Sequence, residues 1–303
     1  MTVSALSIKK SDNCSVDTLC IIGVGLIGGS LARGLKSVGF CRQVVGYSRQ
    51  PQALRDALEL GAIDRAASDV GDAVSGADLV VVAVPVGAME AIFRQINGYL
   101  AAHTVVTDVG STKGSVVNAA RAAFGELPSH LVPAHPIAGA EKSGVKHSQI
   151  ALFEGHNVIM TPLAETEPDA VALVRAMWQS VGARVSEMSV ADHDSILAAT
   201  SHLPHLLAYL LVGTLSRMDQ SEAIFDYAAG GFRDFTRIAS SDPVMWRDIS
   251  LANRDAIIAV AERFEGELTR LKAAIRDEDA AYVENLYSAA KAARDRSILK
   301  SDQ

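Results

Sequence analysis

The chain has little cysteine. Three of its 303 residues are cysteine, at Cys14, Cys20 and Cys41. Their number is odd and their spacing is not that of zinc ligands, so the pattern excludes a disulfide framework and a cysteine-based metal centre. Such sparse cysteine is typical of proteins that work in a reducing compartment.

A surplus of basic residues is also missing. The chain carries 28 Lys and Arg against 35 Asp and Glu, a formal net charge of −7. Nucleic-acid binding depends on basic side chains that replace the counterions of phosphates. The charge balance therefore argues against a nucleic-acid partner, while a local cationic pocket for a small anion stays open.

Long apolar runs are the third absence. The most apolar stretches, residues 79–84 and 206–215, fall well short of the ~18 residues that span a bilayer. Residues 1–17 have no continuous apolar core of the kind found in secretory signals, and we expect them to form a loosely ordered leader. These features predict a cytoplasmic protein without a membrane partner.

Glycine, in contrast, is concentrated near the start of the chain. An apolar, strand-like stretch at residues 19–22 leads into a Gly-x-Gly-x-x-Gly turn and then a helix-like segment. In that order, the glycines allow a tight turn, close approach of a pyrophosphate and close packing of helix on strand. The N-terminus of the helix then faces the phosphates. The sequence predicts a dinucleotide site that includes Gly23, Gly25, Leu26, Ile27 and Gly28.

Strand and helix signals alternate through the first 188 residues. We expect strands at residues 19–24, 43–47, 79–85, 104–108, 131–134, 157–161 and 184–187. Helical patterns lie between several of them, at residues 27–38, 51–60, 89–100, 113–124 and 169–181. Continuous Val- and Ile-rich strands in this alternation indicate an α/β fold with a parallel, doubly wound, Rossmann-type sheet. Residues 1–188 are therefore predicted to form a dinucleotide-binding domain.

Beyond residue 189 the strand signals stop. Residues 189–303 are predicted to form an all-helical domain for substrate binding and dimerisation. Within it, apolar residues repeat at spacings of four and three, as in a coiled-coil seam: Ile257, Ala261, Phe264, Leu268, Leu271 and Ile275. This stripe suits packing against another long helix, and contact with a second subunit in a homodimer is favoured slightly over the alternative of a helix pair within one chain.

The end of the second predicted strand carries no acidic residue. Dinucleotide folds specific for NAD normally place Asp or Glu there, about 20 residues after the glycines. Here Ser48 and Arg49 occupy the place. A hydroxyl and a guanidinium favour a 2′-phosphate, so NADP is the favoured cofactor, with NAD or relaxed use of both open. The alternative is that Arg49 is an ordinary solvated loop residue.

Two polar residues follow neighbouring strands. His135 is expected just past a strand that ends on the ligand-binding edge of the sheet, and Ser111 follows the preceding strand. A neutral imidazole accepts a proton from a hydroxyl near physiological pH. An isolated histidine is more often structural, but this one lies between two prolines and before a glycine-rich loop. We predict His135 as a catalytic base, with Ser111 in reach of it and of the nicotinamide.

At these residues the chain resembles the prephenate/arogenate dehydrogenase family. The resemblance covers GVGLIGGS (23–30), AVPV (83–86), DVGSTKG (108–114), HPIAGAEKSG (135–144), TSHLPH (200–205), GGFRDFTRIA (230–239) and SDPVMWRD (241–248). It implies an oxidative decarboxylation in tyrosine biosynthesis, in which hydride passes to NAD(P), His135 accepts the hydroxyl proton, and loss of carbon dioxide leaves an aromatic ring. No metal is implied.

The resemblance also assigns further site residues. It implies that Ser111 orients His135 and that Val84 and Pro85 line the cofactor. Arg237 would bind a substrate carboxylate, for which a guanidinium is the natural partner. His205 would lie near the substrate side chain and Glu141 would shape the charge of the pocket. Prephenate and arogenate are not distinguished, and we expect both to be accepted.

Alternatives remain for these assignments. His205 also suits a hydrogen bond within a helical core, Glu141 a surface carboxylate, and Arg237 a structural ion pair. At the level of function, a nonenzymatic dinucleotide sensor would keep the glycines without needing His135. A dehydrogenase of the β-hydroxyacid type would need a catalytic lysine, for which Lys113 and Lys142 are the prominent candidates.

Overall fold

The computed structural model describes residues 15–139 and 142–301. Its strands are β1 (Val16–Ile22), β2 (Cys41–Tyr47), β3 (Arg65–Ala66), β4 (Leu79–Val82), β5 (Val105–Asp108), β6 (Leu131–Val132), β7 (Ala134–Pro136), β8 (Asn157–Met160) and β9 (Arg184–Glu187). The helices up to β9 are α1 (Leu26–Ser37), α2 (Pro51–Glu59), α3 (Val70–Val74), α4 (Met89–Ile96), α5 (Lys113–Phe124) and α6 (Pro168–Ser180). Short 3-10 turns add η1 (Val86–Ala88) and η2 (Val145–His147).

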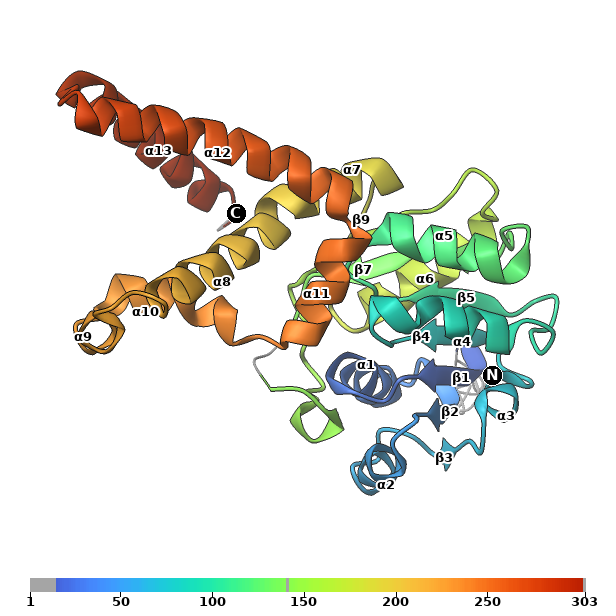
Figure 1. Cartoon of the computed structure of the whole chain (residues 1–303). Coiled ribbons are helices and arrows are strands. Elements are labelled where there is room, and N and C mark those ends of the chain that lie inside the picture. The colour runs from blue at the N-terminus through green and yellow to red at the C-terminus, as the bar shows by residue number, and fades with distance from the viewer. Residues whose placement is uncertain (1–14, 140–141, 302–303) are drawn as a thin grey trace, which may run out of the picture. The chain divides into compact units, whose positions relative to one another are not determined.

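The first six strands form one parallel sheet, in the order β3-β2-β1-β4-β5-β6. Figure 1 shows helices on both faces of this sheet. The strands that follow β1 in the chain are added first on its β2 side and then on its β4 side, so the direction in which strands are added reverses at β1. In doubly wound folds, ligands bind at the carboxyl ends of the strands at such a switch point. The predicted Rossmann-type α/β fold is confirmed.

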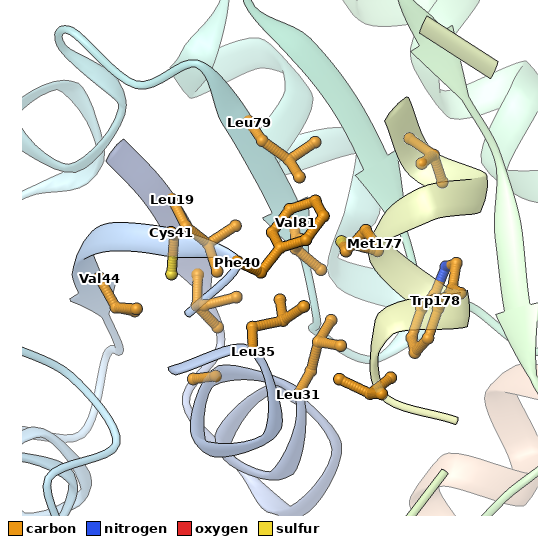
Figure 2. Packing of buried hydrophobic residues seen from close by; sticks show 14 of the residues in the cluster. Leu19, Leu31, Leu35, Phe40, Cys41, Val44, Leu79, Val81, Met177 and Trp178 are labelled. Atoms are coloured by element: carbon orange, nitrogen blue, oxygen red, sulfur yellow. The ribbon is translucent and has the colours of Figure 1, made fainter. Parts of the chain in front are cut away.

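Side-chain alternation along β1 separates two cores. Leu19 and Ile21 point into one apolar cluster, and Cys20 and Ile22 point into the other. Figure 2 shows the first cluster, in which Leu31 and Leu35 of α1 lie close to side chains of the central strands. The α6 side chains Met177 and Trp178 complete this cluster, and helices α3, α4 and α5 cover the opposite face. Burial on both faces explains the continuous apolar strands.

The last three strands depart from the expected single sheet. They form a second sheet, β7-β8-β9, in which β7 and β8 are antiparallel. The expectation that residues 157–161 and 184–187 extend the parallel sheet was therefore wrong. Pro133 separates β6 from β7 and has no N–H for a ladder, so the chain leaves the first sheet there. The sequence of a short apolar run such as 157–161 does not show which of the two sheets the strand joins.

The start of the chain also differs slightly from expectation. β1 begins at Val16, inside the segment expected to be a leader, and Ser15 donates its backbone N–H to Phe40. Residues 1–14 lie outside the described residues.

From Val190 to the end of the described chain the structure is helical, as predicted. The helices are α7 (Val190–Leu197), η3 (Ala198–His202, a π-helical turn), α8 (Leu203–Leu215), α9 (Ser221–Asp226), α10 (Gly230–Thr236), η4 (Arg237–Ser240, 3-10) and α11 (Pro243–Ala252), followed by α12 (Arg254–Arg276) and α13 (Ala280–Ser301).

Helices α7, η3 and α8 make one run, Val190–Leu215, which is longer than the sequence led us to expect. It has 26 residues and a mean hydropathy of 1.4, enough by length and composition alone to cross a bilayer, and 22% of its apolar window is buried. The expectation that apolar segments are too short to span a membrane was therefore wrong for this helix. Its first part carries buried His193 and packs on α5.

The chain divides into two compact units, residues 1–254 and 255–303. In the second unit, α13 runs back toward the start of α12 (Figure 1). Along α12 the second half of the predicted apolar seam is the more exposed: the exposed fractions are 41% for Phe264, 45% for Leu268 and 58% for Ile275, whereas Ile257 is buried, with 7% exposed.

Candidate active site

The glycine turn has the shape of a phosphate cradle. Gly23 has a φ of +99°, and a Cβ there would lie 2.2 Å from the carbonyl oxygen of Ala83. A Cβ on Gly28 would lie 2.3 Å from the carbonyl oxygen of Gly23. A Cβ on Gly25, in contrast, would meet no atom within 4 Å. Two glycines are thus required by the protein's own packing, and the third leaves open space at the N-terminus of α1, where a pyrophosphate fits.

The other predicted cofactor residues follow the neighbouring strands. Leu26 and Ile27 form the first turn of α1, and Val84 and Pro85 come after β4. Ser48 follows β2, and its hydroxyl accepts a 3.2 Å hydrogen bond from the N–H of Gln50. Arg49 beside it is exposed. The structure therefore gathers these residues at the carboxyl ends of β1, β2 and β4.

A buried ion pair supports the next strand end. The Nζ of Lys113 lies 2.6 Å from Oδ2 of Asp108, at the end of β5, and donates a second 2.6 Å bond to the carbonyl of Ala134. Both side chains are fully buried, and burial lowers the pKa of Lys113 although Asp108 counteracts it. Asp108 also accepts the backbone N–H groups of Gly110 and Ala134. The pair thus fixes the turn that carries Ser111 against β7.

His135 lies within β7, not past the end of a strand of the main sheet as expected. The difference follows from Pro133, after which the chain starts the second sheet. The Nδ1 of His135 lies 3.0 Å from Nε2 of His193 on α7. Burial lowers the pKa of His135 well below its usual range, and the nearby charges of Lys113, His193 and His202 lower it further. His135 is therefore a neutral imidazole at physiological pH.

Ser111 lies in the turn between β5 and α5 and is partly buried. The resemblance implied that it orients His135, but the partner that the structure gives the imidazole is His193. A role for Ser111 at the histidine stays a prediction. Glu141 lies outside the described residues.

A second cluster surrounds Trp246 of α11. The ring of His205 stacks on Trp246 with centroids 3.5 Å apart and an interplanar angle of 19°, and His202 meets the same indole edge-on at 6.1 Å. The π-helical turn η3 immediately precedes α8, on which His205 lies, and such turns are frequent at functional sites. Burial lowers the pKa of His205, and the charge of Arg237 lowers it further. Arg237, in η4, is thus an electrostatic neighbour of His205.

The sequence analysis missed several residues of this region. It did not single out His193, Asp194 or Asn253, and it considered Lys113 only as part of a motif and as the candidate lysine of an alternative dehydrogenase. The Nδ2 of Asn253 donates 2.8 Å to the backbone carbonyl of Asp194 and lies 3.1 Å from Nδ1 of His202. The adjacent His-Asp pair directly after the last strand was the available signal. Among residues 15–139 and 142–301, no group of three His, Cys, Asp or Glu side chains is placed to hold a metal ion.

Comparisons with known proteins agree with this arrangement. Residues 31–187 match the family model described as prephenate dehydrogenase, nucleotide-binding domain, and residues 189–288 match prephenate dehydrogenase, dimerization domain. The cyclohexadienyl dehydrogenase of Zymomonas mobilis is 39% identical over 291 residues, 94% of this chain and 96% of the relative. The prephenate dehydrogenase of Bacillus subtilis is 36% identical, with 92% of this chain and 75% of the relative covered.

A solved structure is similar over nearly the whole chain. It is prephenate dehydrogenase from A. aeolicus in complex with hydroxyphenyl propionate and NAD+, with a TM-score of 0.86, 38% identity, and coverage of 93% of this chain and 99% of that one. The glycine cradle and the matched nucleotide-binding model together assign an NAD(P) site to the carboxyl edge of the sheet. By its motifs, its fold and these matches along most of its length, the chain belongs to the prephenate dehydrogenase family.

Proposed function

We propose that this protein oxidatively decarboxylates prephenate, arogenate or both, with NAD(P)+ as oxidant, and so serves tyrosine biosynthesis. The observation that carries the proposal is the buried, neutral imidazole of His135, in a chain of this family that also has a glycine cradle. The products are 4-hydroxyphenylpyruvate from prephenate and tyrosine from arogenate.

The reaction needs a base, a hydride acceptor and a means of aligning the ring. His135 accepts the proton of the ring hydroxyl, for which a neutral imidazole with a free nitrogen is required. When bound, NAD(P)+ accepts the hydride from the carbon that carries that hydroxyl. Loss of carbon dioxide from the opposite carbon then makes the ring aromatic. Because aromatisation supplies a large driving force, the protein's main task is to align the ring and to hold the base neutral.

The substrate end of the site is assigned to the Trp246 cluster. Arg237 binds a carboxylate of the substrate through its guanidinium fork, and His205 lies near the substrate side chain. The stack of His205 on Trp246 fixes the plane of that imidazole. Glu141 shapes the charge of the pocket, and Ser111 lies between the histidine and the nicotinamide. Prephenate and arogenate differ only at the side chain, and we propose that both are accepted.

NADP is the proposed preferred cofactor. Ser48 and the exposed Arg49 stand where an acidic residue would otherwise repel a 2′-phosphate. The hydroxyl of Ser48 is held near the end of β2 by the N–H of Gln50, so both donors for a phosphate lie on one short turn. NAD is the alternative, with the same cradle and a weaker contact at the ribose.

We further propose a cytoplasmic homodimer with residues 1–188 as the nucleotide-binding domain and 189–303 as the substrate and dimerisation domain. The exposed apolar seam of α12 supports a second subunit. The family match of the C-terminal residues, which is described as a dimerization domain, also supports a homodimer.

Initial rates in four combinations test the proposal: prephenate or arogenate, each with NAD+ or NADP+, followed by absorbance of the reduced cofactor. We expect turnover with both substrates and a higher kcat/KM with NADP+ than with NAD+. An Arg49→Ala variant is expected to lose the NADP+ advantage and keep its rate with NAD+. A strong preference for NAD+ in the wild type would contradict the cofactor assignment, and no turnover in any combination would contradict the proposed reaction.

A further inference from the structure

Asp194 joins two helices at the base of the active site. Its Oδ1 accepts the backbone N–H of Lys113 at 2.8 Å, and its Oδ2 accepts that of Gly114 at 2.8 Å. These two N–H groups open α5 and have no partner within their own helix. The same Oδ1 lies 2.8 Å from Nδ1 of His193. Asp194 therefore ties α7 to the start of α5 and holds the ring of His193.

The charge state of Asp194 decides which nitrogen of His193 carries a proton. Burial acts to raise the pKa of Asp194, but hydrogen bonds from His193 and from the backbone of Lys113 and Gly114 bring it below its ordinary value. The carboxylate is thus ionised at neutral pH and only accepts hydrogen bonds. Nδ1 of His193 must therefore be protonated, and in the neutral ring Nε2 then carries the lone pair.

The same assignment of donor and acceptor nitrogens applies to the ring of His135. Nε2 of His193 lies 3.0 Å from Nδ1 of His135, so Nδ1 of His135 must be the donor. In a neutral imidazole only one nitrogen carries hydrogen, which leaves Nε2 of His135 unprotonated. We propose that His193 and Asp194 are positioning residues that fix His135 as the Nδ1–H tautomer, with Nε2 free to accept the substrate proton. The inference rests on the proposed role of His135 as the base.

Other charged groups lie near the two rings, and within residues 15–139 and 142–301 the hydrogen-bond partner of Nδ1 of His135 is His193. From α5 and β5 come Lys113 and Asp108, which bond to each other. From η3 comes His202, whose Nδ1 faces the amide of Asn253. These neighbours bear on the charge of His135, whereas the chain from Asp194 through His193 decides its tautomer. A wrong tautomer would place a hydrogen where the base needs a lone pair.

Two substitutions at His193 separate this function from simple packing. In His193→Gln the side-chain amide oxygen reaches the place of Nε2 and accepts the N–H of His135. In His193→Leu nothing accepts it. For His193→Leu we expect kcat to fall about 10²-fold or more, by analogy with loss of the tautomer-fixing group in hydrolase triads, with substrate KM changed only a few-fold. His193→Gln is expected to recover most of that loss. Wild-type kcat in His193→Leu, or an equal loss in both variants, would overturn the inference.

The tautomer of His135 can also be measured by spectroscopy on the intact wild-type chain. This test does not require that a His193 variant folds. Nitrogen-15 NMR of histidine-labelled protein distinguishes Nδ1–H from Nε2–H tautomers, and the signals of His135 are assigned by their loss in His135→Asn. We expect the Nδ1–H tautomer for His135. An Nε2–H tautomer in an enzyme that turns over would refute the positioning role alone, whereas an Nδ1–H tautomer in a protein without turnover would refute the proposed reaction alone.

Discussion

The sheet region and the helical region treat apolar side chains differently. Helix α1 has 12 residues and buries seven of them against the sheet. Helix α8 has 13 residues, is richer in large apolar side chains, and has Ala208 as its buried residue. Leu210 on α8 is 54% exposed, whereas Leu31 on α1 is fully buried. The sheet region thus completes its core within one chain, while the helical region leaves large apolar side chains exposed.

The largest expected effect is at the buried ion pair of the sheet region. Asp108→Ala leaves Lys113 buried without its carboxylate, and breaking such a pair costs about 3–5 kcal/mol of unfolding free energy. The control is Lys36→Ala, which removes a partly exposed pair with Asp64 and is expected to cost less than ~1 kcal/mol. Urea denaturation measures both. Equal losses would contradict the idea that Asp108 and Lys113 form a structural centre of the site.

A matched pair of leucines compares the two regions directly. Leu31→Ala creates a cavity in the cluster drawn in Figure 2 and is expected to lower the free energy of unfolding by about 2–5 kcal/mol. Leu210→Ala, on exposed surface, is expected to change it by no more than about 0.5 kcal/mol at low protein concentration. Urea titrations of both variants decide the matter, and similar losses would show that the helical region has a complete core of its own.

At the junction of the regions, the buried His202 predicts a pH dependence of stability. Burial lowers its pKa to about 4 from 6.5. Between these values the unfolded chain binds a proton that the folded chain does not, so stability falls as pH decreases from about 6.5 and levels off below about 4. The loss is of order 1–3 kcal/mol. His202→Gln is expected to flatten this slope in denaturation measured from pH 7 to pH 4, and an unchanged slope would contradict the assignment.

The exposed seam of α12 is expected to give the smallest change in single-chain stability and a clear change in assembly. Leu268→Asp places a charge on the seam and should weaken self-association at least tenfold, about 1.4 kcal/mol. Ala273→Asp on the opposite side of the same helix is the control and should leave association intact. Sedimentation over a range of concentrations tests both. A wild type that stays monomeric would refute the dimer.

Much of the fold was predictable because its signals are local. The glycine turn, the apolar strands at 79–82 and 105–108, and the switch to helices after residue 189 follow from composition and periodicity. The second sheet was not predictable in this way, because a one-residue break at Pro133 and a short apolar run at 157–160 do not reveal strand direction.

The site, like the fold, was predictable from the sequence only in part. The sequence singled out the glycines by their place at a strand end, and His135 by its two flanking prolines and the glycine-rich loop after it. It did not reveal the contact between His135 and His193, which joins residues 58 positions apart and depends on how α7 packs against α5. The stack of His205 on Trp246 likewise follows from tertiary packing of α8 and α11.

The most direct test of the account compares the wild type with His135→Asn. Asparagine keeps a polar side chain of similar reach but is not a base at neutral pH. We expect cofactor affinity, measured by fluorescence titration, to be unchanged, and turnover of prephenate and arogenate to fall about 10²- to 10⁴-fold. Loss of turnover with intact cofactor binding would establish His135 as the base of this oxidative decarboxylation. Turnover retained in His135→Asn would contradict the central claim.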